Sequence, residues 1–322
     1  MNNTKITEPI KNIFSAQKAP IAMLLIFITM LFFKTPFYTS YNLIDLVNSN
    51  STLLIVAMGF TVVLVAGGVD LSVGGVMTVS GIIAILLINR GIAIPVAVLV
   101  SILFGAAIGA INGYLTVYQN TEPFIITLGM GVLLTGVAQE LTTARPISGE
   151  NPAFQNLANY KLFGVVPALV LVMIVTVIVV VWLLRSTSFG RNCYAIGGDY
   201  EVAKYSGINV LPTKTLTFVI SGVTAAIAGV MLSSWVNSGN STYGDTTALY
   251  IASAVVVGGT SFAGGIGGAF KSLLGVMFIG ILSNAFNMLN IDSYIQQLLV
   301  GLFIVGIIWL DCYDRKVKRE TV

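Results

Sequence analysis

The sequence contains no histidine and few charged residues, and both shortages narrow what the protein can be. Lys, Arg, Asp and Glu make up 9% of its 322 residues, whereas a soluble domain carries about 25%. Hydrophobic residues make up 56%. The low charge and the high share of hydrophobic residues exclude ordinary soluble folds. A transmembrane barrel would show segments of about ten residues with alternating hydrophobicity, and none is visible in the sequence. The composition therefore predicts an all-α polytopic membrane protein.

The missing histidines also limit the chemistry, because histidine is the commonest metal ligand and proton relay. Without it no Ser-His-Asp or Cys-His set can form, and Cys193 and Cys312 belong to no cysteine motif. The stretch GGIGGAFKS at 264–272 fails as a phosphate loop, because Ala269 and Phe270 stand where Gly and Lys are required. We therefore expect no enzyme activity, metal or cofactor in this chain, and the net charge of +3 does not indicate nucleic acid.

Ten apolar stretches predict ten membrane spans. A span needs about 20 apolar residues, and fewer where helices are buried among others. Residues 51–88 are too long for one helix, since 38 residues rise about 57 Å. They must hold two spans or one span and a re-entrant piece, broken near Gly67 and Gly68, and 247–289 has similar breaks at Gly258–Gly259 and Gly264–Gly265. The expected spans are 20–36, 51–67, 71–88, 93–117, 123–142, 164–184, 214–236, 247–260, 266–289 and 294–311.

The positive charges predict how these spans are oriented. With ten spans, twelve Lys and Arg residues fall on the side of both termini and four on the other, so both termini are expected in the cytoplasm. The first apolar run lacks a small-x-small cleavage site, which predicts a retained span. We expect a cytoplasmic segment at 1–19, a transmembrane domain at 20–311 with a cytoplasmic loop at 185–214, and a basic cytoplasmic tail at 312–322. Spans two to five and seven to ten would enter with opposite polarity, which suggests an inverted repeat.

Several polar residues within the spans are candidates for lining a pathway. Asp70 lies in GGVDLSVGG between two apolar segments, and intramembrane acids are costly and often functional. The alternative is that Asp70, with Ser72 beside it, caps the third span. Asn112 adjoins the stripe Gly105, Gly109 and Gly113, which predicts close helix packing. The full set, for which pathway lining and helix packing both stay open, is Asp70, Ser72, Asn112, Phe124, Thr127, Asn284 and Asn287.

The longest polar interruption, residues 185–214, lies on the predicted cytoplasmic side. Within it, Asp199 to Ser206 is a mixed-charge stretch that can form a short helix. Gly197 and Gly198 precede this stretch and Gly207 follows it, as expected of helix stop signals. A short rigid helix between glycines can transmit a displacement to the membrane-spanning helices. The alternative is a solvated loop that joins two halves of the protein.

Four ordered motifs resemble the ABC sugar-importer permeases of the ribose type. They are the T-x-FGR…YAIGGD…SGINV pattern across 187–210, GGVDLSVGG at 67–75, PFIITLGM at 123–130 and AVVVGGTSFAGG at 254–265. The resemblance covers roughly residues 45–310. Family members often have Asn and later paired Ala where this chain has Asp199 and Val202-Ala203, which predicts a differently charged contact surface.

The resemblance implies a bacterial plasma-membrane permease that works as two copies, identical or paralogous. Its implied partners are ATP-binding subunits that hold ATP–Mg and an extracytoplasmic sugar-binding protein, in addition to membrane lipid. The contact with the ATPase would be made by Gly190, Arg191, Gly197, Asp199, Glu201, Ala203 and Gly207. The expected cargo is a monosaccharide. The alternative function is an ion- or proton-coupled transporter of a small polar solute, which would need a relay through Asp70 or Glu140.

Overall fold

The computed structural model describes residues 18–33, 35–162, 164–292, 294–299, 301–302 and 305–306. The predicted tail 312–322 lies outside these residues, as does the predicted segment 1–19 except for its last two residues. The described part is almost entirely helical, and its four strands have two residues each. This confirms the predicted all-helical class.

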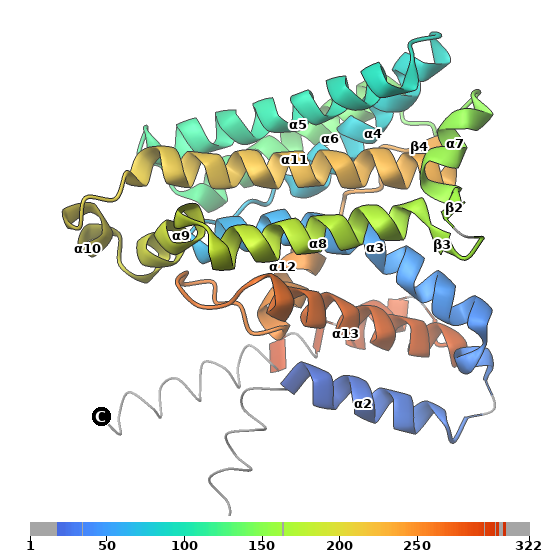
Figure 1. Ribbon diagram of the computed structural model, residues 1–322. Coiled ribbons are helices and arrows are strands. Elements are labelled where there is room, and N and C mark those ends of the chain that lie inside the picture. Colours follow the sequence, from blue (N-terminus) through green and yellow to red (C-terminus); the bar gives the residue numbers. More distant parts are fainter. Residues whose placement is uncertain are drawn as a thin grey trace, which may run out of the picture.

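Thirteen helical elements have bounds within the described residues, and residues 294–299, 301–302 and 305–306 are helical as well. The elements are α2 (Lys18–Met30), η1 (Pro36–Tyr38), α3 (Ser40–Val65), α4 (Val73–Asn89), α5 (Ile94–Val117), α6 (Pro123–Thr142), α7 (Pro152–Asn159), α8 (Ala168–Ser186), α9 (Ser188–Gly198), α10 (Tyr200–Tyr205), α11 (Val210–Val236), α12 (Thr247–Val257) and α13 (Ala269–Met288). The long helices α5, α8, α11 and α13 lie roughly side by side (Figure 1).

The strands join loops at the end of the bundle opposite α10 (Figure 1). β1 (Ile147–Ser148) pairs antiparallel with β4 (Ser238–Gly239), and β2 (Lys161–Leu162) pairs with β3 (Val166–Pro167). The short helix α7 lies beside them and buries Phe154 and Ala158. The loop between α6 and α7 and the loop between α11 and α12 are therefore tied together by the β1–β4 pair.

Six described helices are long and apolar enough to cross a membrane, namely α3, α5, α6, α8, α11 and α13. Three shorter apolar helices lie within α2, α4 and α12. Each of the first nine predicted spans overlaps one of these nine helices, and the tenth is described only in part. Together they establish a polytopic helical membrane protein.

Helix α3 begins at Ser40, eleven residues before the predicted start of the second span. The side chain of Thr39 accepts a hydrogen bond from the Asn42 backbone N–H and so caps the helix. Two buried amides in the first part of the helix have hydrogen-bond partners: Asn42 Nδ2 donates to the Phe37 carbonyl at 2.8 Å, and Asn50 Nδ2 donates to the Leu46 carbonyl at 2.7 Å. Hydrogen-bonded polar side chains are compatible with burial, so the helix extends into a stretch that the predicted spans leave out.

Both predicted breaks are present. Between α3 and α4 the chain leaves helical geometry at Gly67, whose φ is 72°. Between α12 and α13, Gly259, Gly264 and Gly265 have φ of 98°, 83° and 69°. Glycine adopts this left-handed region without steric cost, whereas other residues adopt it rarely. Each glycine pair therefore ends a helix inside an apolar segment, as the sequence predicts.

The core lies around α3, whose residues 54–65 are all buried. Helix α11 packs on α5 through glycines (Figure 1). A Cβ placed on Gly105 would lie 2.4 Å from the Gly222 carbonyl oxygen, and one on Gly109 would lie 2.3 Å from the Phe218 carbonyl oxygen. The two backbones are therefore in direct contact, which confirms that the glycine stripe of α5 is a packing surface.

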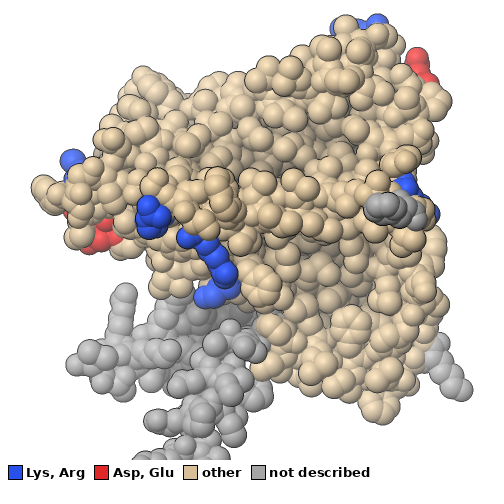
Figure 2. Space-filling view, viewed as in Figure 1, with Lys and Arg blue, Asp and Glu red and all other residues tan. Residues whose placement is uncertain are grey.

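Charged side chains lie toward the two ends of the molecule on the face that Figure 2 shows, and the stretch between them is uncharged. One end carries α9 and α10, and the other carries α7 and the strands (Figure 1). This separation is expected of a bundle with an apolar belt, because charged side chains are costly at membrane depth.

Candidate functional site

The predicted coupling region forms two helices, α9 and α10, at one end of the bundle, and α10 lies beyond the ends of the long helices (Figure 1). Thr187 begins α9, because its hydroxyl oxygen accepts from the Gly190 N–H at 3.1 Å. Asp199 begins α10 in the same way, since its Oδ1 accepts from the Val202 N–H at 3.0 Å. Gly207, with φ of 80°, follows the end of α10. The sequence predicted the second helix and its limits.

The first helix was not predicted, and it changes the role of one glycine pair. Gly197 and Gly198 form the last residues of α9 rather than a loop before α10. The turn between the two helices is made by Asp199 alone, whose backbone is extended with φ of −157°. Gly197 lies against the end of α3 and the loop between α12 and α13.

The remaining predicted coupling residues divide into a packed and an exposed set. Gly190 is buried, and a Cβ there would lie 2.3 Å from the Leu184 carbonyl oxygen. Ala203 packs with Ile196 and Val210, which joins α10 to α9 and α11. In contrast, Arg191, Asp199 and Glu201 are exposed. The packed residues hold the two helices in place, so the exposed charges are free to meet a partner.

Four of the seven pathway candidates form one buried polar cluster. Asp70 Oδ1 accepts from the Ser72 hydroxyl at 2.6 Å and from the Ser72 N–H at 3.1 Å. Asn112 Nδ2 of α5 donates to the Ser72 oxygen at 2.8 Å. The Leu71 N–H donates to Thr127 Oγ1 of α6 at 3.0 Å. The cluster thus fastens the broken segment before α4 to two neighbouring helices. Ser72 stands at the N-cap of α4 without a side-chain cap hydrogen bond, and Asp70 Oδ1 bonds only within the segment before the helix, so the capping interpretation is not supported.

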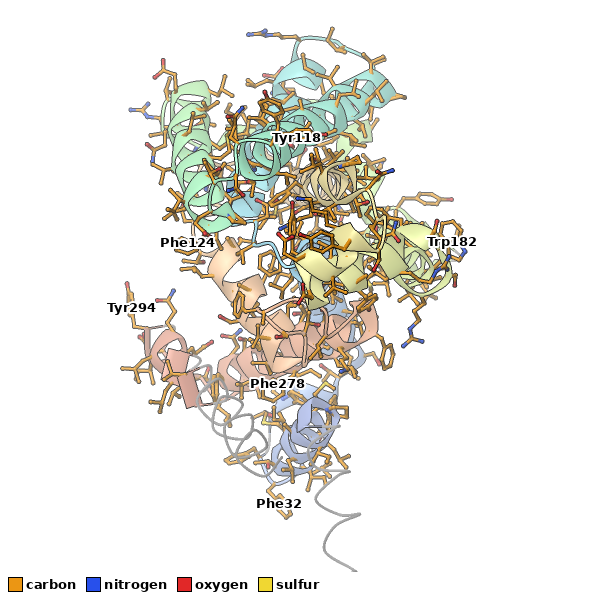
Figure 3. The ribbon with its side chains drawn as sticks, turned by 90° about the vertical axis from the view of Figure 1, so that its left-hand side faces the viewer. Phe32, Tyr118, Phe124, Trp182, Phe278 and Tyr294 are labelled. Carbon is orange, nitrogen blue, oxygen red and sulfur yellow. The ribbon has the colours of Figure 1, made fainter. Side chains whose placement is uncertain are left out.

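The other three candidates lie elsewhere. Phe124 is at the margin of the molecule when it is viewed from the α10 end (Figure 3), and its side chain is exposed. Asn284 exchanges two hydrogen bonds with Asn42 of α3, at 2.9 and 3.0 Å. Asn287 is exposed, and its Oδ1 accepts from Gln296 Nε2 at 2.8 Å. Although Asn284 and Asn287 are one helical turn apart, they have separate partners.

Sequence reasoning missed two sets of contacts near the breaks. Thr61 Oγ1 of α3 donates to Ser272 Oγ of α13 at 2.7 Å, and Ser272 Oγ lies 3.2 Å from Thr260 Oγ1. The Tyr194 hydroxyl of α9 donates to the Gly267 carbonyl at 3.0 Å. Isolated hydroxyls in apolar helices carry no pattern that predicts such pairs. The glycine-rich run 258–268 was the signal that pointed to this loop.

Burial affects the pKa of two side chains of α9, Cys193 and Tyr194. Cys193 is buried, and this raises the pKa of its thiol to about 12. Burial also raises the pKa of the Tyr194 phenol, while the positive charge of Arg185 opposes that rise. Both groups are therefore neutral at physiological pH. Among the described residues, no group of three or more Cys, Asp or Glu side chains could hold a metal ion.

A bundle of apolar helices with broken spans defines an integral membrane protein. Residues 42–308 match the family described as branched-chain amino acid transport system permease component. Because this match spans more than half of the sequence, the chain belongs to that permease family.

Curated proteins agree with this assignment. The chain is 33% identical to the ribose import permease protein RbsC of Haemophilus influenzae, over 92% of this chain and 93% of that protein. It is 32% identical to the D-allose transport system permease protein AlsC of Escherichia coli, over 85% and 84%. It is 32% identical to the L-arabinose transport system permease protein AraH of the same organism, over 94% and 92%. The expectation of a transport subunit rather than an enzyme is thereby confirmed.

Proposed function

We propose that this chain is the membrane subunit of an ATP-driven importer that moves a monosaccharide, a pentose or hexose, into the cell. The relatives named above are permeases for ribose, allose and arabinose, which supports a sugar as cargo. The observation that carries the proposal is the pair α9–α10, which lies at one end of the bundle with its charges exposed. A partner ATPase binds and hydrolyses ATP, and this chain supplies alternating access.

The orientation follows from the same pair of helices. The α9–α10 end carries Arg185, Arg191, Lys204 and Lys214, so it belongs in the cytoplasm under the positive-inside rule. The α7 end, with the β1–β4 pair, then faces outward and receives the sugar-binding protein. We infer ten membrane crossings, cytoplasmic termini and a bacterial plasma membrane location. Two copies of the permease, identical or paralogous, complete the transporter.

Reconstitution tests this function directly. The purified chain is reconstituted in proteoliposomes with its ATPase and a sugar-binding protein. ATP is supplied on the side of the membrane that carries the ATPase. Uptake of radiolabelled ribose, allose and arabinose is then measured. We expect uptake of at least one sugar that depends on ATP and on both partners. Uptake on a proton or sodium gradient without the ATPase would support the alternative transporter class and refute our assignment.

Variants of Asp199 separate its two roles at the contact surface. Asp199→Asn keeps an oxygen that can accept from the Val202 N–H but removes the negative charge, whereas Asp199→Ala removes both. If the ATPase recognises the charge, both variants lose coupled transport. If Asp199 only begins α10, Asp199→Asn retains transport and Asp199→Ala loses part of it. Asp199→Lys should uncouple ATP hydrolysis from uptake while membrane insertion stays intact.

A further inference from the structure

Three glycine-containing segments, far apart in the sequence, meet where α9 contacts the bundle. They are the end of α3 at residues 65–67, the end of α9 at 197–198, and the loop between α12 and α13 at 264–265. We call these three segments the glycine junction. Two of them are the helix breaks within apolar segments, and the third belongs to the helix pair that faces the ATPase in the proposed function.

The contacts in the glycine junction are between backbones. A Cβ on Gly197 would lie 1.9 Å from the Val65 carbonyl oxygen and 2.5 Å from the Gly265 nitrogen. A Cβ on Gly264 would lie 2.8 Å from both the Gly197 oxygen and Gly67 Cα. Real Cβ atoms do not approach other atoms this closely, because van der Waals repulsion rises steeply. The three segments therefore touch with no side chain between them.

Hydrogen bonds fasten the same three segments to one another. The Gly265 N–H donates to the Val65 carbonyl at 2.9 Å, which joins the second break to the first. The Tyr194 hydroxyl donates to the Gly267 carbonyl at 3.0 Å, which joins α9 to the second break. Tyr194 lies one helical turn before Gly197, so both contacts come from one face of α9.

The loop 258–268 is also held on its far side. The Gly268 N–H donates to Thr260 Oγ1 at 3.2 Å, and Thr260 lies beside Ser272 of α13, which accepts from Thr61 of α3. These hydroxyls connect the loop to α13 and, through Ser272, to α3. A displacement of the loop at Gly265 is therefore carried to α3 and α13 rather than absorbed locally.

We propose that Tyr194 and Gly197 are positioning residues that transmit movement of α9 to both broken spans at once. The proposal rests on the proposed function, because it requires an ATPase that moves the α9–α10 pair. Its physical basis is that contacts between backbones cannot yield by a change of rotamer, whereas long side chains at an interface can. Because of the glycine junction, α9 and the two helix breaks are expected to move together.

Neighbouring glycines provide a matched pair of variants. Gly197→Ala places a methyl group against the Val65 carbonyl and separates the segments, whereas a Cβ at Gly198 would meet nothing within 4 Å. Both changes add one methyl group at the end of the same helix. In the complete reconstituted transporter, we expect Gly197→Ala to lower the sugar molecules transported per ATP hydrolysed by about tenfold. Gly198→Ala should stay within about twofold of wild type.

Tyr194→Phe tests the inference independently, and it also covers the case in which Gly197→Ala fails to assemble. It removes the hydroxyl that binds the Gly267 carbonyl and keeps the ring. Loss of one hydrogen bond should lower transport per ATP by about threefold. ATP hydrolysis should stay near the wild-type rate, and the thermal stability of the complex should fall only by the small amount expected for one lost hydrogen bond. A purely structural role would instead lower stability, hydrolysis and transport together, and would refute the positioning role.

The failures of the two proposals can be told apart. If the wild-type complex shows no ATP-dependent sugar uptake, the proposed function fails. If the wild-type complex transports sugar and Tyr194→Phe has the wild-type ratio of transport to ATP hydrolysis, the glycine junction does not transmit movement. Equal effects of Gly197→Ala and Gly198→Ala would overturn the inference as well, because only the first change reaches another segment.

Discussion

Substitution of Gly109 by alanine is expected to destabilise the bundle, although alanine is the better helix former. A Cβ at this position of α5 would lie 2.3 Å from the Phe218 carbonyl oxygen and 2.8 Å from Val219 Cα. An ordinary carbon–oxygen contact is about 3.3 Å or longer, so α5 and α11 would have to separate by about 1 Å. Because both neighbours are backbone atoms, no rotamer change can relieve the clash.

The size of the effect follows from two opposing terms. Overpacking costs about 1–3 kcal/mol, and the rigid backbone contact points to the upper end of that range. A separation of 0.5–1 Å also forfeits a quarter to a half of the dispersion energy of the contacts concerned. Replacement of glycine by alanine within a helix returns about 1 kcal/mol. We therefore expect a net loss of about 2 kcal/mol.

Gly136→Ala is the matched control, since Gly136 lies within α6 and a Cβ there would meet nothing within 4 Å. It should keep the gain in helix propensity of about 1 kcal/mol without a clash. The detergent-solubilised variants are heated and the folded fraction is followed by size-exclusion chromatography. The apparent Tm of Gly109→Ala should fall by several degrees, whereas that of Gly136→Ala should stay or rise. A Gly109→Ala variant as stable as wild type would refute the backbone-contact interpretation of the glycine stripe.

Thr127→Val should lower the free energy of unfolding by about 1–3 kcal/mol, because it leaves the buried Leu71 N–H without its acceptor. Thr135→Val loses only a bond within α6 and should lower the free energy of unfolding by less than about 1 kcal/mol. Equal apparent Tm values of the two variants in the same heating assay would contradict this. The reactivity of Cys193 toward N-ethylmaleimide is measured at pH 8 in a Cys312→Ser variant. In the folded protein Cys193 should not react, because the thiol is buried and its pKa is raised to about 12, so that it stays neutral and inaccessible. After denaturation it should react. Mass spectrometry measures the adduct, and rapid labelling of the folded protein would show that α9 is not packed as described.

The contact surface illustrates how far local sequence patterns reach. Asp199 and Gly207 predicted the limits of α10, because a capping side chain and a left-handed glycine act on their own neighbours. Gly197 is expected from the sequence in the same turn, whereas in the structure it packs against Val65 and Gly265. Its role depends on Val65 and Gly265, which are distant in the sequence, so no local rule could have identified it.

The polar candidates show the same division. Ser72 is close to Asp70 in the chain, and their hydrogen bond is a local contact within the segment before α4. The pairing of Asn42 with Asn284 was not predicted, because residues 40–50 looked too polar for a span. An amide in an apolar helix is tolerated only when it finds a partner, and the partner's position is a matter of helix packing.

The sequence by itself determined the class of protein, most helix positions and the location of both breaks. Low charge, long apolar runs and glycine pairs each act through local physical effects: transfer into lipid, helix propensity and permitted backbone angles. Only the tertiary structure decided that the two breaks meet each other and the end of α9. Contacts between backbones leave no pattern of side chains in the sequence, except for the glycines that make room for them.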